Sequence, residues 1–124
     1  ANLNILVVDD SGIVAKKLTK MLQELGHTVV GTAKTGKQAV EQFTALKPDF
    51  VTMDITMPDM DGIEATKLIL ADTPDALIAM VTSHGQEQMV MDAIDAGAKG
   101  YVLKPFDKAK LEETIAKILD QYGG

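Results

Sequence analysis

The sequence predicts an α/β fold in which a doubly wound, five-stranded parallel sheet is built in the order (βα)5. Short runs of branched apolar residues alternate along the chain with segments whose apolar residues recur every three or four positions. Such alternation is typical of a parallel sheet that helices cover on both faces. The chain has 124 residues, so we expect a single domain over residues 1–124.

The expected strands are the short apolar runs. They comprise residues 4–8, 28–33, 49–53, 76–81 and 100–104. Several of these runs are apolar at consecutive positions, as in strands that are buried on both faces. The expected order of elements therefore begins with a strand and continues as alternating helices and strands.

Apolar stripes with helical spacing mark the segments between these strands. They lie within residues 14–25, 40–46, 63–70, 86–96 and 111–122. Gly26 and Gly97 stand where the end of a helix commonly uses a left-handed residue, and Pro48 and Pro74 follow two other helices. These stop signals support the helices that the stripes predict.

Composition narrows the classes of function. The net charge of -6 disfavours nucleic acid and anionic membranes as partners, because such binding depends largely on Lys and Arg. The absence of Cys excludes disulfides, thiolate metal sites and a cysteine nucleophile. No apolar run reaches the roughly 20 residues of a spanning helix, and the N-terminus lacks a signal-peptide pattern, so we expect a cytoplasmic protein without membrane insertion.

Polar residues follow four of the expected strands. They are Asp9 with Asp10, Asp54, Thr82 with Ser83, and Lys104 with Pro105. In an open parallel sheet, ligands bind outside the carboxyl ends of the strands, so these side chains should converge. Carboxylates about 4 Å apart repel by about 4 kcal/mol at an effective dielectric constant of about 20, and Mg²⁺ would relieve that repulsion. An aspartate in such a site can accept a phosphoryl group as an acyl phosphate.

Each of these residues also has a purely structural interpretation. Asp9 and Asp10 could only cap the helix that follows them. Asp54, Thr82 and Lys104 could be a turn residue, a buried hydroxyl and a solvated strand end. Their joint placement at four strand ends favours the functional interpretation.

Four motifs carry a resemblance to a known family. They are "VVDD" (7–10), "MDITMPDMDG" (53–62), "VTS" (81–83) and "GAKGYVLKPF" (97–106). On these motifs the chain resembles, over essentially its whole length, the receiver domain of two-component response regulators, and most closely the stand-alone chemotaxis regulators of the CheY type. The resemblance implies a flavodoxin-like sheet with strand order 2-1-3-4-5.

The resemblance also implies a phosphorylation site and a metal site. Asp54 would be the phosphoacceptor. Asp9, Asp10 and Asp54 would hold Mg²⁺, together with the backbone carbonyl of Thr56. Lys104 would pair with the phosphoryl oxygens and would be catalytic together with Asp54.

The switch residues are likewise implied by the resemblance. Thr82 would be catalytic and would move to donate a hydrogen bond to the phosphoryl group, and the ring of Tyr101 would then turn inward. The bond between Lys104 and Pro105 would be cis. His84 occupies a position that tunes dephosphorylation in the family, although an exposed loop histidine is the simpler interpretation.

The implied function is a phosphorylation-controlled signalling switch and not an enzyme, although the chain would catalyse its own phosphorylation and dephosphorylation. A sensor histidine kinase would supply the phosphoryl group. The output of a monomer without an effector domain would be contact with a flagellar motor switch protein or another target, and a phosphatase would be a further partner. The segment "GQEQMV" (85–90) favours chemotaxis.

Three alternatives remain open at this point. A stand-alone or truncated receiver of a non-chemotaxis phosphorelay would carry the same motifs. A magnesium-dependent phosphohydrolase with an aspartyl nucleophile would use a D-x-D pattern, but Thr56 stands where the second Asp acts as general acid. A flavodoxin-like redox module would need a Ser/Thr-rich phosphate loop and a stacking Trp, which the sequence lacks.

Overall fold

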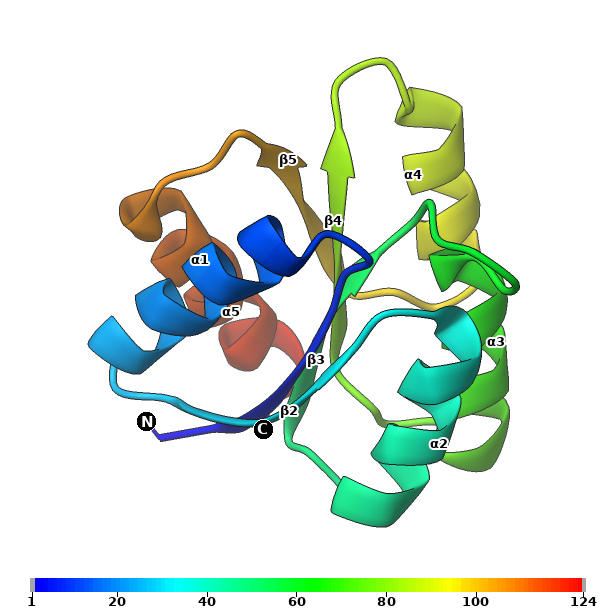
Figure 1. The fold of residues 1–124 in the computed structure, drawn as a ribbon, viewed down its shortest axis with the longest axis horizontal. Helices are drawn as coiled ribbons and strands as arrows, with labels where there is room; N and C mark the ends of the chain where they lie inside the picture. The colour runs from blue at the N-terminus through cyan, green and yellow to red at the C-terminus, as the bar shows by residue number, and fades with distance from the viewer. Residues whose placement is uncertain (1, 124) are drawn as a thin grey trace.

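The computed structural model describes residues 2–123, and within them strands and helices alternate from end to end (Figure 1). The strands are β1 Asn4–Val8, β2 Thr28–Ala33, β3 Phe50–Asp54, β4 Ile78–Ser83 and β5 Gly100–Lys104. The helices are α1 Gly12–Glu24, α2 Gly36–Leu46, α3 Gly62–Asp72, α4 Glu87–Asp95 and α5 Lys108–Tyr122. The predicted alternation is confirmed.

The strands form one parallel sheet in the order β2-β1-β3-β4-β5. This is the flavodoxin-like order, so the predicted fold class is confirmed. Helices α1 and α5 cover one face of the sheet, and α2, α3 and α4 cover the other (Figure 1). Because the strands all run in one direction, their carboxyl ends meet at a single edge of the sheet.

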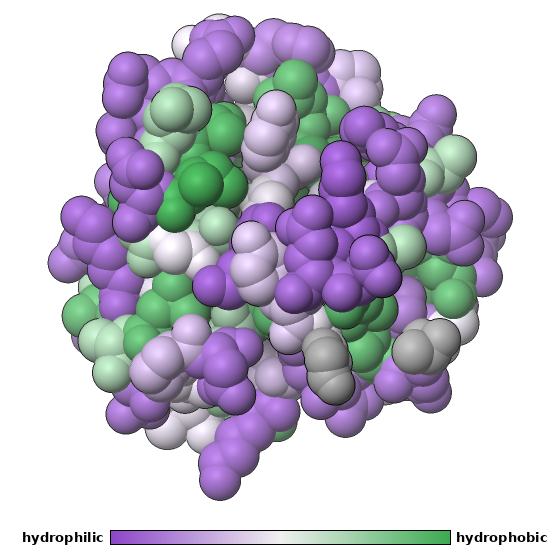
Figure 2. Space-filling model, turned by 180° about the vertical axis from the view of Figure 1, so that it is seen from behind, coloured by the Kyte–Doolittle hydropathy of each residue, from purple (hydrophilic) through white to green (hydrophobic). Residues whose placement is uncertain are grey.

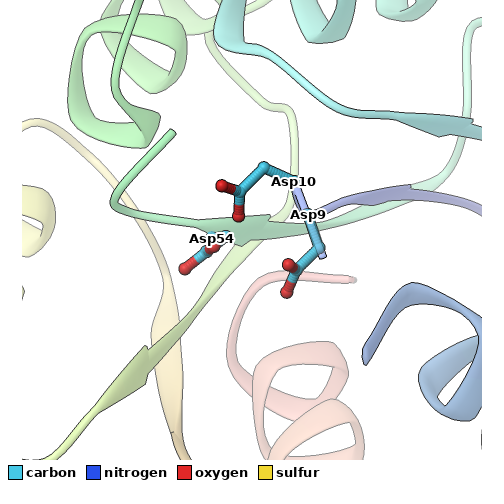
Figure 3. A group of neighbouring side chains, drawn as sticks. All are labelled: Asp9, Asp10 and Asp54. Carbon is cyan, nitrogen blue, oxygen red and sulfur yellow. The ribbon is translucent and has the colours of Figure 1, made fainter. Parts of the chain in front are cut away.

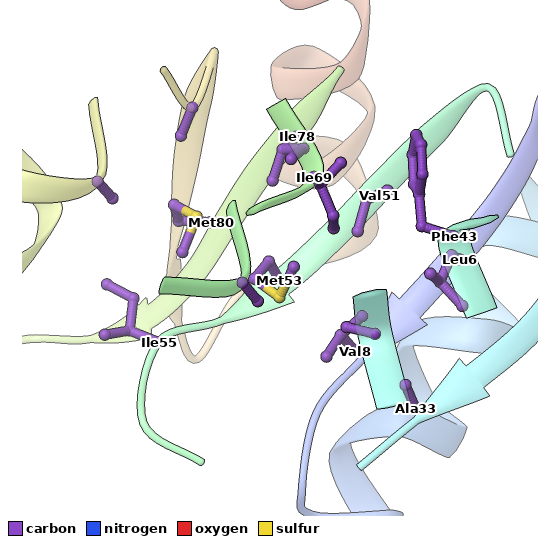
Figure 4. Close-up of a cluster of buried hydrophobic side chains, with 14 of the residues drawn as sticks. Leu6, Val8, Ala33, Phe43, Val51, Met53, Ile55, Ile69, Ile78 and Met80 are labelled. Atoms are coloured by element: carbon purple, nitrogen blue, oxygen red, sulfur yellow. The ribbon is translucent and has the colours of Figure 1, made fainter. Parts of the chain in front are cut away.

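Alternate residues of the strands pack against opposite layers of helices. Ile5 and Val7 of β1 belong to the cluster under α1 and α5, whereas Leu6 and Val8 belong to the cluster under α2, α3 and α4. Figure 4 shows the latter cluster, in which β1, β3 and β4 contribute buried side chains such as Met53. Since both faces of the central strands are covered, β1, β3 and β4 are buried at consecutive positions, as the sequence indicated for several strands.

The helix boundaries follow the expected signals. Ser11 precedes α1 and its hydroxyl accepts a hydrogen bond from the Val14 backbone N–H at 3.3 Å. Gly26 and Gly97 have φ angles of 93° and 114° just beyond α1 and α4, where only glycine adopts such values without strain. None of the helices within residues 2–123 combines the length and the apolar character that crossing a membrane requires.

The observed β4 begins and ends two residues later than the predicted strand at 76–81. Thr82 pairs with Leu103 and Ser83 with Lys104, so both polar residues lie within the strand and do not follow it. The sequence pattern ended at the last apolar residue, whereas the backbone ladder continues because hydrogen bonding between strands does not depend on side-chain polarity.

Candidate functional site

Two neighbouring strands place three carboxylates side by side. Val8 of β1 pairs with Met53 of β3, so the residues that come next lie side by side: Asp9 directly after β1, and Asp54 as the last residue of β3. Asp10 follows directly on the β1 side. Ligand oxygens of the three aspartates lie within 4.8 Å of one another, and Figure 3 shows the three side chains grouped where β1 and β3 end.

Asp9 is the most deeply buried of the three carboxylates, with 1% of its surface exposed. Its Oδ1 accepts a hydrogen bond from the Ser11 backbone N–H at 2.9 Å. Its Oδ2 is also buried but accepts no hydrogen bond from the part of the chain that the structure describes. A buried carboxylate oxygen without a hydrogen bond is costly, unless a cation stabilises it.

Lys104 supplies a cation beside two of the aspartates. It ends β5, next to Ser83 of β4, and its Nζ lies 3.1 Å from Asp9 Oδ2 and 3.6 Å from Asp54 Oδ1. Three carboxylates and one ammonium leave the group with a formal charge of two negative units when all are ionised. One divalent cation would neutralise this excess negative charge.

Asp54 is held in an environment that opposes its ionisation. The pKa of Asp54 is raised from 3.8 to about 6, chiefly by burial and also by the charges of Asp9 and, more weakly, Asp10. The ammonium of Lys104 and a hydrogen bond from the Ile55 backbone lower the pKa but do not offset these effects. A bound cation would favour the charged carboxylate.

The donor set fits a hard divalent cation. Oxygen ligands from carboxylates are the ones that Mg²⁺ prefers, and it commonly uses one or two of them with water and phosphate oxygens completing its shell. Asp9 offers a buried oxygen that accepts no hydrogen bond from the described residues and lies beside the Lys104 ammonium, while Asp10 is exposed and can reach a solvated ion. The predicted cluster of three aspartates is therefore present and could hold a metal.

Thr82 lies at the same edge of the sheet and is 1% exposed. Its hydroxyl donates a hydrogen bond to Oε1 of Gln86, and the Ser83 backbone N–H donates to the same oxygen at 3.4 Å. Nε2 of Gln86 in turn donates to Thr56 Oγ1 at 3.3 Å. Gln86 was not among the residues predicted from the sequence, because Thr82 lies in β4 and the loop between β4 and α4 has no periodic pattern that points to Gln86.

The other predicted switch residues lie close to this network. Tyr101 of β5 is 48% exposed and lines a surface groove together with Ser83 and Gln86. The peptide bond between Lys104 and Pro105 is cis, as predicted. The described contacts of Thr56 involve its side chain, so the metal-binding role of its carbonyl stays a prediction.

A glycine that the sequence reasoning did not single out allows the loop after β3 to fold back. The Gly62 backbone N–H donates to the Ile55 carbonyl at 2.7 Å, and a Cβ at position 62 would lie 2.0 Å from the Asp54 carbonyl oxygen. Asp61 caps α3 through the Glu64 N–H at 2.8 Å. Asp61 therefore fixes the start of α3, while Gly62 lies directly against the backbone of Asp54.

Comparison with known proteins places these features in a family. Residues 5–116 match the family described as "Response regulator receiver domain". The chain is 46% identical to the chemotaxis protein CheY of Bacillus subtilis, over 94% of this chain and 97% of that protein.

Similar solved structures support the same family assignment. The crystal structure of a CheX-CheY-BeF3-Mg²⁺ complex from Borrelia burgdorferi is similar, with a TM-score of 0.89 and 36% identity over 94% of this chain and 88% of that chain. A two-component response regulator of the LuxR family from Aurantimonas has a TM-score of 0.91 and 34% identity, over 98% of this chain and 87% of that chain. The chain therefore belongs to the response regulator receiver domain family of two-component signalling.

Proposed function

We propose that the protein is a phosphorylation-controlled switch in which Asp54 accepts a phosphoryl group. The observation that carries this proposal is the placement of Asp54, which is nearly buried, lies 3.6 Å from the ammonium of Lys104 and shares its site with Asp9 and Asp10. Asp9, Asp10, Asp54 and the Thr56 carbonyl would hold Mg²⁺, and the grouping of ligand oxygens from the three aspartates within 4.8 Å supports the carboxylate part of this set.

The chemistry requires few protein groups. A carboxylate oxygen of Asp54 attacks the phosphorus in line, the bond to the donor nitrogen or oxygen breaks, and the leaving group takes its electron pair. Mg²⁺, when bound, neutralises charge on the transferring group. Lys104 contributes a second positive charge at the phosphoryl oxygens, and attack by water later releases phosphate and restores the carboxylate of Asp54.

The signal would be a shift in population between two arrangements of the same fold. In the proposed active arrangement, Thr82 donates to a phosphoryl oxygen and the ring of Tyr101, now 48% exposed, turns inward. The change would be read on the surface of α4, β5 and α5. Met91 and Ile94 of α4 are 59% and 40% exposed there, and Figure 2 shows hydrophobic side chains at the upper left, on the side where α4 lies.

The partners follow from this function. A sensor histidine kinase of the chemotaxis type would supply the phosphoryl group, and a flagellar motor switch protein would be the target of the phosphorylated monomer in the cytoplasm. The similarity to chemotaxis proteins from Bacillus subtilis and Borrelia burgdorferi supports this pathway. The complex of CheX with CheY in the latter organism supports a separate protein, such as a phosphatase, as an additional partner.

A receiver from a pathway other than chemotaxis is the second candidate. The similarity to the LuxR-family regulator favours it, since that protein has the same fold at a TM-score of 0.91. A pull-down with the phosphorylated chain distinguishes the two candidates: capture of a motor switch protein supports chemotaxis. Capture of a phosphotransfer protein or a different target supports the second candidate.

The phosphoacceptor is tested with acetyl phosphate and Mg²⁺, followed by intact-protein mass spectrometry. We expect the wild type to gain the mass of one phosphoryl group and Asp54→Asn to gain none. Asp59→Asn is the matched control, because Asp59 lies in the same loop at a φ of 68° that Asn tolerates. An adduct of undiminished yield in Asp54→Asn would contradict the proposal.

A further inference from the structure

We propose that Gln86 is a positioning residue that holds the Thr82 hydroxyl in the unphosphorylated arrangement and so sets the threshold for switching. This inference rests on the proposed phosphorylation of Asp54. It gives a defined role to a side chain that lies between the carboxylate site and α4 and that belongs to neither the metal ligands nor the phosphoryl contacts.

The amide of Gln86 bridges the end of a strand and a loop. Its Oε1 accepts hydrogen bonds from the Thr82 hydroxyl and from the Ser83 backbone N–H, the latter at 3.4 Å. Its Nε2 donates to Thr56 Oγ1 at 3.3 Å. One side chain therefore connects the end of β4 with the loop that follows Asp54.

The role of Gln86 differs from that of the other residues at helix N-termini. Within residues 2–123, the other helices begin after a side chain that accepts a hydrogen bond from the first turn; these residues are Ser11, Thr35, Asp61 and Asp107. Gln86 occupies the same position before α4 but makes no capping hydrogen bond. Its amide is instead directed to Thr82 and Thr56, so the contacts are not a by-product of capping.

The bond to Gln86 competes with the proposed bond to the phosphoryl group. A threonine hydroxyl has a single proton to donate. While Thr82 donates to Gln86 it cannot donate to a phosphoryl oxygen on Asp54, and the burial of Thr82 leaves little access for water to take over either bond. The net value of one hydrogen bond corresponds to about a three- to tenfold change in an equilibrium constant.

Breaking the bridge would also affect α4. Once released from Thr82 and Thr56, the Gln86 amide is free to rearrange at the first turn of the helix whose exposed residues include Met91. The same side chain thus links the state of the phosphorylation site to the surface that we propose to contact the target.

The first measurement is a titration with beryllofluoride, a stable substitute for the phosphoryl group, in the presence of Mg²⁺. The concentration at half saturation is read from the backbone amide resonance of Ile55. Gln86→Ala should lower it by about three- to tenfold, because the competing hydrogen bond is gone. Gln88→Ala is the matched control and should leave it unchanged, since Gln88 is exposed on the same helix and donates to Asp92 at 3.1 Å.

A second pair of variants tests whether Gln86 acts through the hydroxyl. Thr82→Val removes the hydroxyl while keeping the shape of the side chain. In this background Gln86→Ala should have no further effect on the half-saturating concentration, so the two substitutions should be strongly non-additive. An equal effect of Gln86→Ala in both backgrounds would mean that it acts only through the stability of α4, and the proposal would be wrong.

The metal-free protein gives a readout that does not depend on phosphoryl binding. There Gln86→Ala should shift the amide resonances of both Thr56 and Ser83, whereas Gln88→Ala should shift only those of α4. Unshifted Thr56 and Ser83 resonances would overturn the proposed bridge. A wild type that binds no beryllofluoride would contradict the proposed function itself, whereas normal binding with Gln86→Ala indistinguishable from wild type would overturn this inference alone.

Discussion

The surroundings of Asp54 oppose the ionisation of its carboxyl group. Its burial and the neighbouring Asp9 raise its pKa to about 6, compared with 3.8 for an ordinary aspartate. The folded chain therefore holds the proton of Asp54 more tightly than the unfolded chain does. In the metal-free protein, the contribution of Asp54 to the free energy of unfolding should fall as the pH rises from about 4 to about 6, and the loss should be complete above that range.

Asp54→Asn should remove this loss. A pKa increase of this size corresponds to a loss of at most about 3 kcal/mol in the free energy of unfolding. Solvent access to the site reduces this loss. We therefore expect Asp54→Asn to stabilise the metal-free protein by about 1 to 2 kcal/mol at neutral pH. Near pH 4 the difference between variant and wild type should be close to zero. Urea unfolding over this pH range, with a chelator present, measures both values.

Asp75→Asn is the control for that experiment, because Asp75 is exposed in the segment before β4, away from the carboxylate group. The difference in free energy of unfolding between Asp75→Asn and wild type should stay the same between pH 4 and neutral pH. A stability difference for Asp54→Asn that does not vary with pH would mean that charge repulsion at the site is not its cause.

At the scale of elements, the connection between β3 and α3 determines where Asp54 stands. Gly62 opens α3 and lies against the backbone of Asp54, where a Cβ would come within 2.0 Å of the carbonyl oxygen. Backbone atoms cannot move aside as a flexible side chain can. The loop and the strand end must therefore shift together if any other residue occupies position 62.

Gly62→Ala should destabilise the protein by about 3 kcal/mol, because this overlap resembles severe overpacking of a core. It should also slow phosphorylation by acetyl phosphate, since the Asp54 carboxylate moves with its backbone. Thermal unfolding and the rate of adduct formation measure the two effects.

Gly12→Ala provides the matched comparison. Gly12 is likewise the first residue of a helix, α1, but a Cβ there would meet no atom within 4 Å. We expect this variant to be neutral or to gain about 0.5 kcal/mol, because alanine restricts the unfolded chain more than glycine does. Equal destabilisation by both substitutions would show that helix geometry, and not contact with Asp54, explains the requirement for glycine.

These elements also show what the sequence could and could not predict. The order of strands and helices was readable because the central strands are covered on both faces and each helix packs with one face on the sheet, which leaves distinct patterns of apolar residues. The grouping of Asp9, Asp54 and Lys104 followed from the rule that parallel strands end at the same edge. The contacts of Gln86 and Gly62 did not follow, because they depend on how loops fold in space and not on periodicity.

At the scale of the whole molecule, the carboxylate group connects metal binding to stability. A cation that binds only the folded chain raises its free energy of unfolding, by about 2.7 kcal/mol when the free ion is at a hundred times its dissociation constant. For a chain of this size we expect Mg²⁺ at such concentrations to raise the melting temperature by about 10 °C.

Asp9→Asn should abolish most of this increase, since it removes the negative charge from a ligand whose Oδ2 has no hydrogen bond. Asp75→Asn should retain the full increase. Calorimetry at several concentrations of Mg²⁺ provides the measurement, and the same increase in Asp9→Asn as in wild type would place the stabilising ion elsewhere on the molecule.

The parallel sheet has a further consequence for when the protein can become active. The side chains at its functional edge come from Asp9 near the start of the chain, Asp54 in the middle and Lys104 near the end. During synthesis on the ribosome, Asp54 emerges well before β5, and the nascent chain at that stage has carboxylates without their ammonium partner. A kinase that recognises the assembled site would therefore not phosphorylate unfinished chains. Signalling would be confined to molecules in which β5 has joined the sheet.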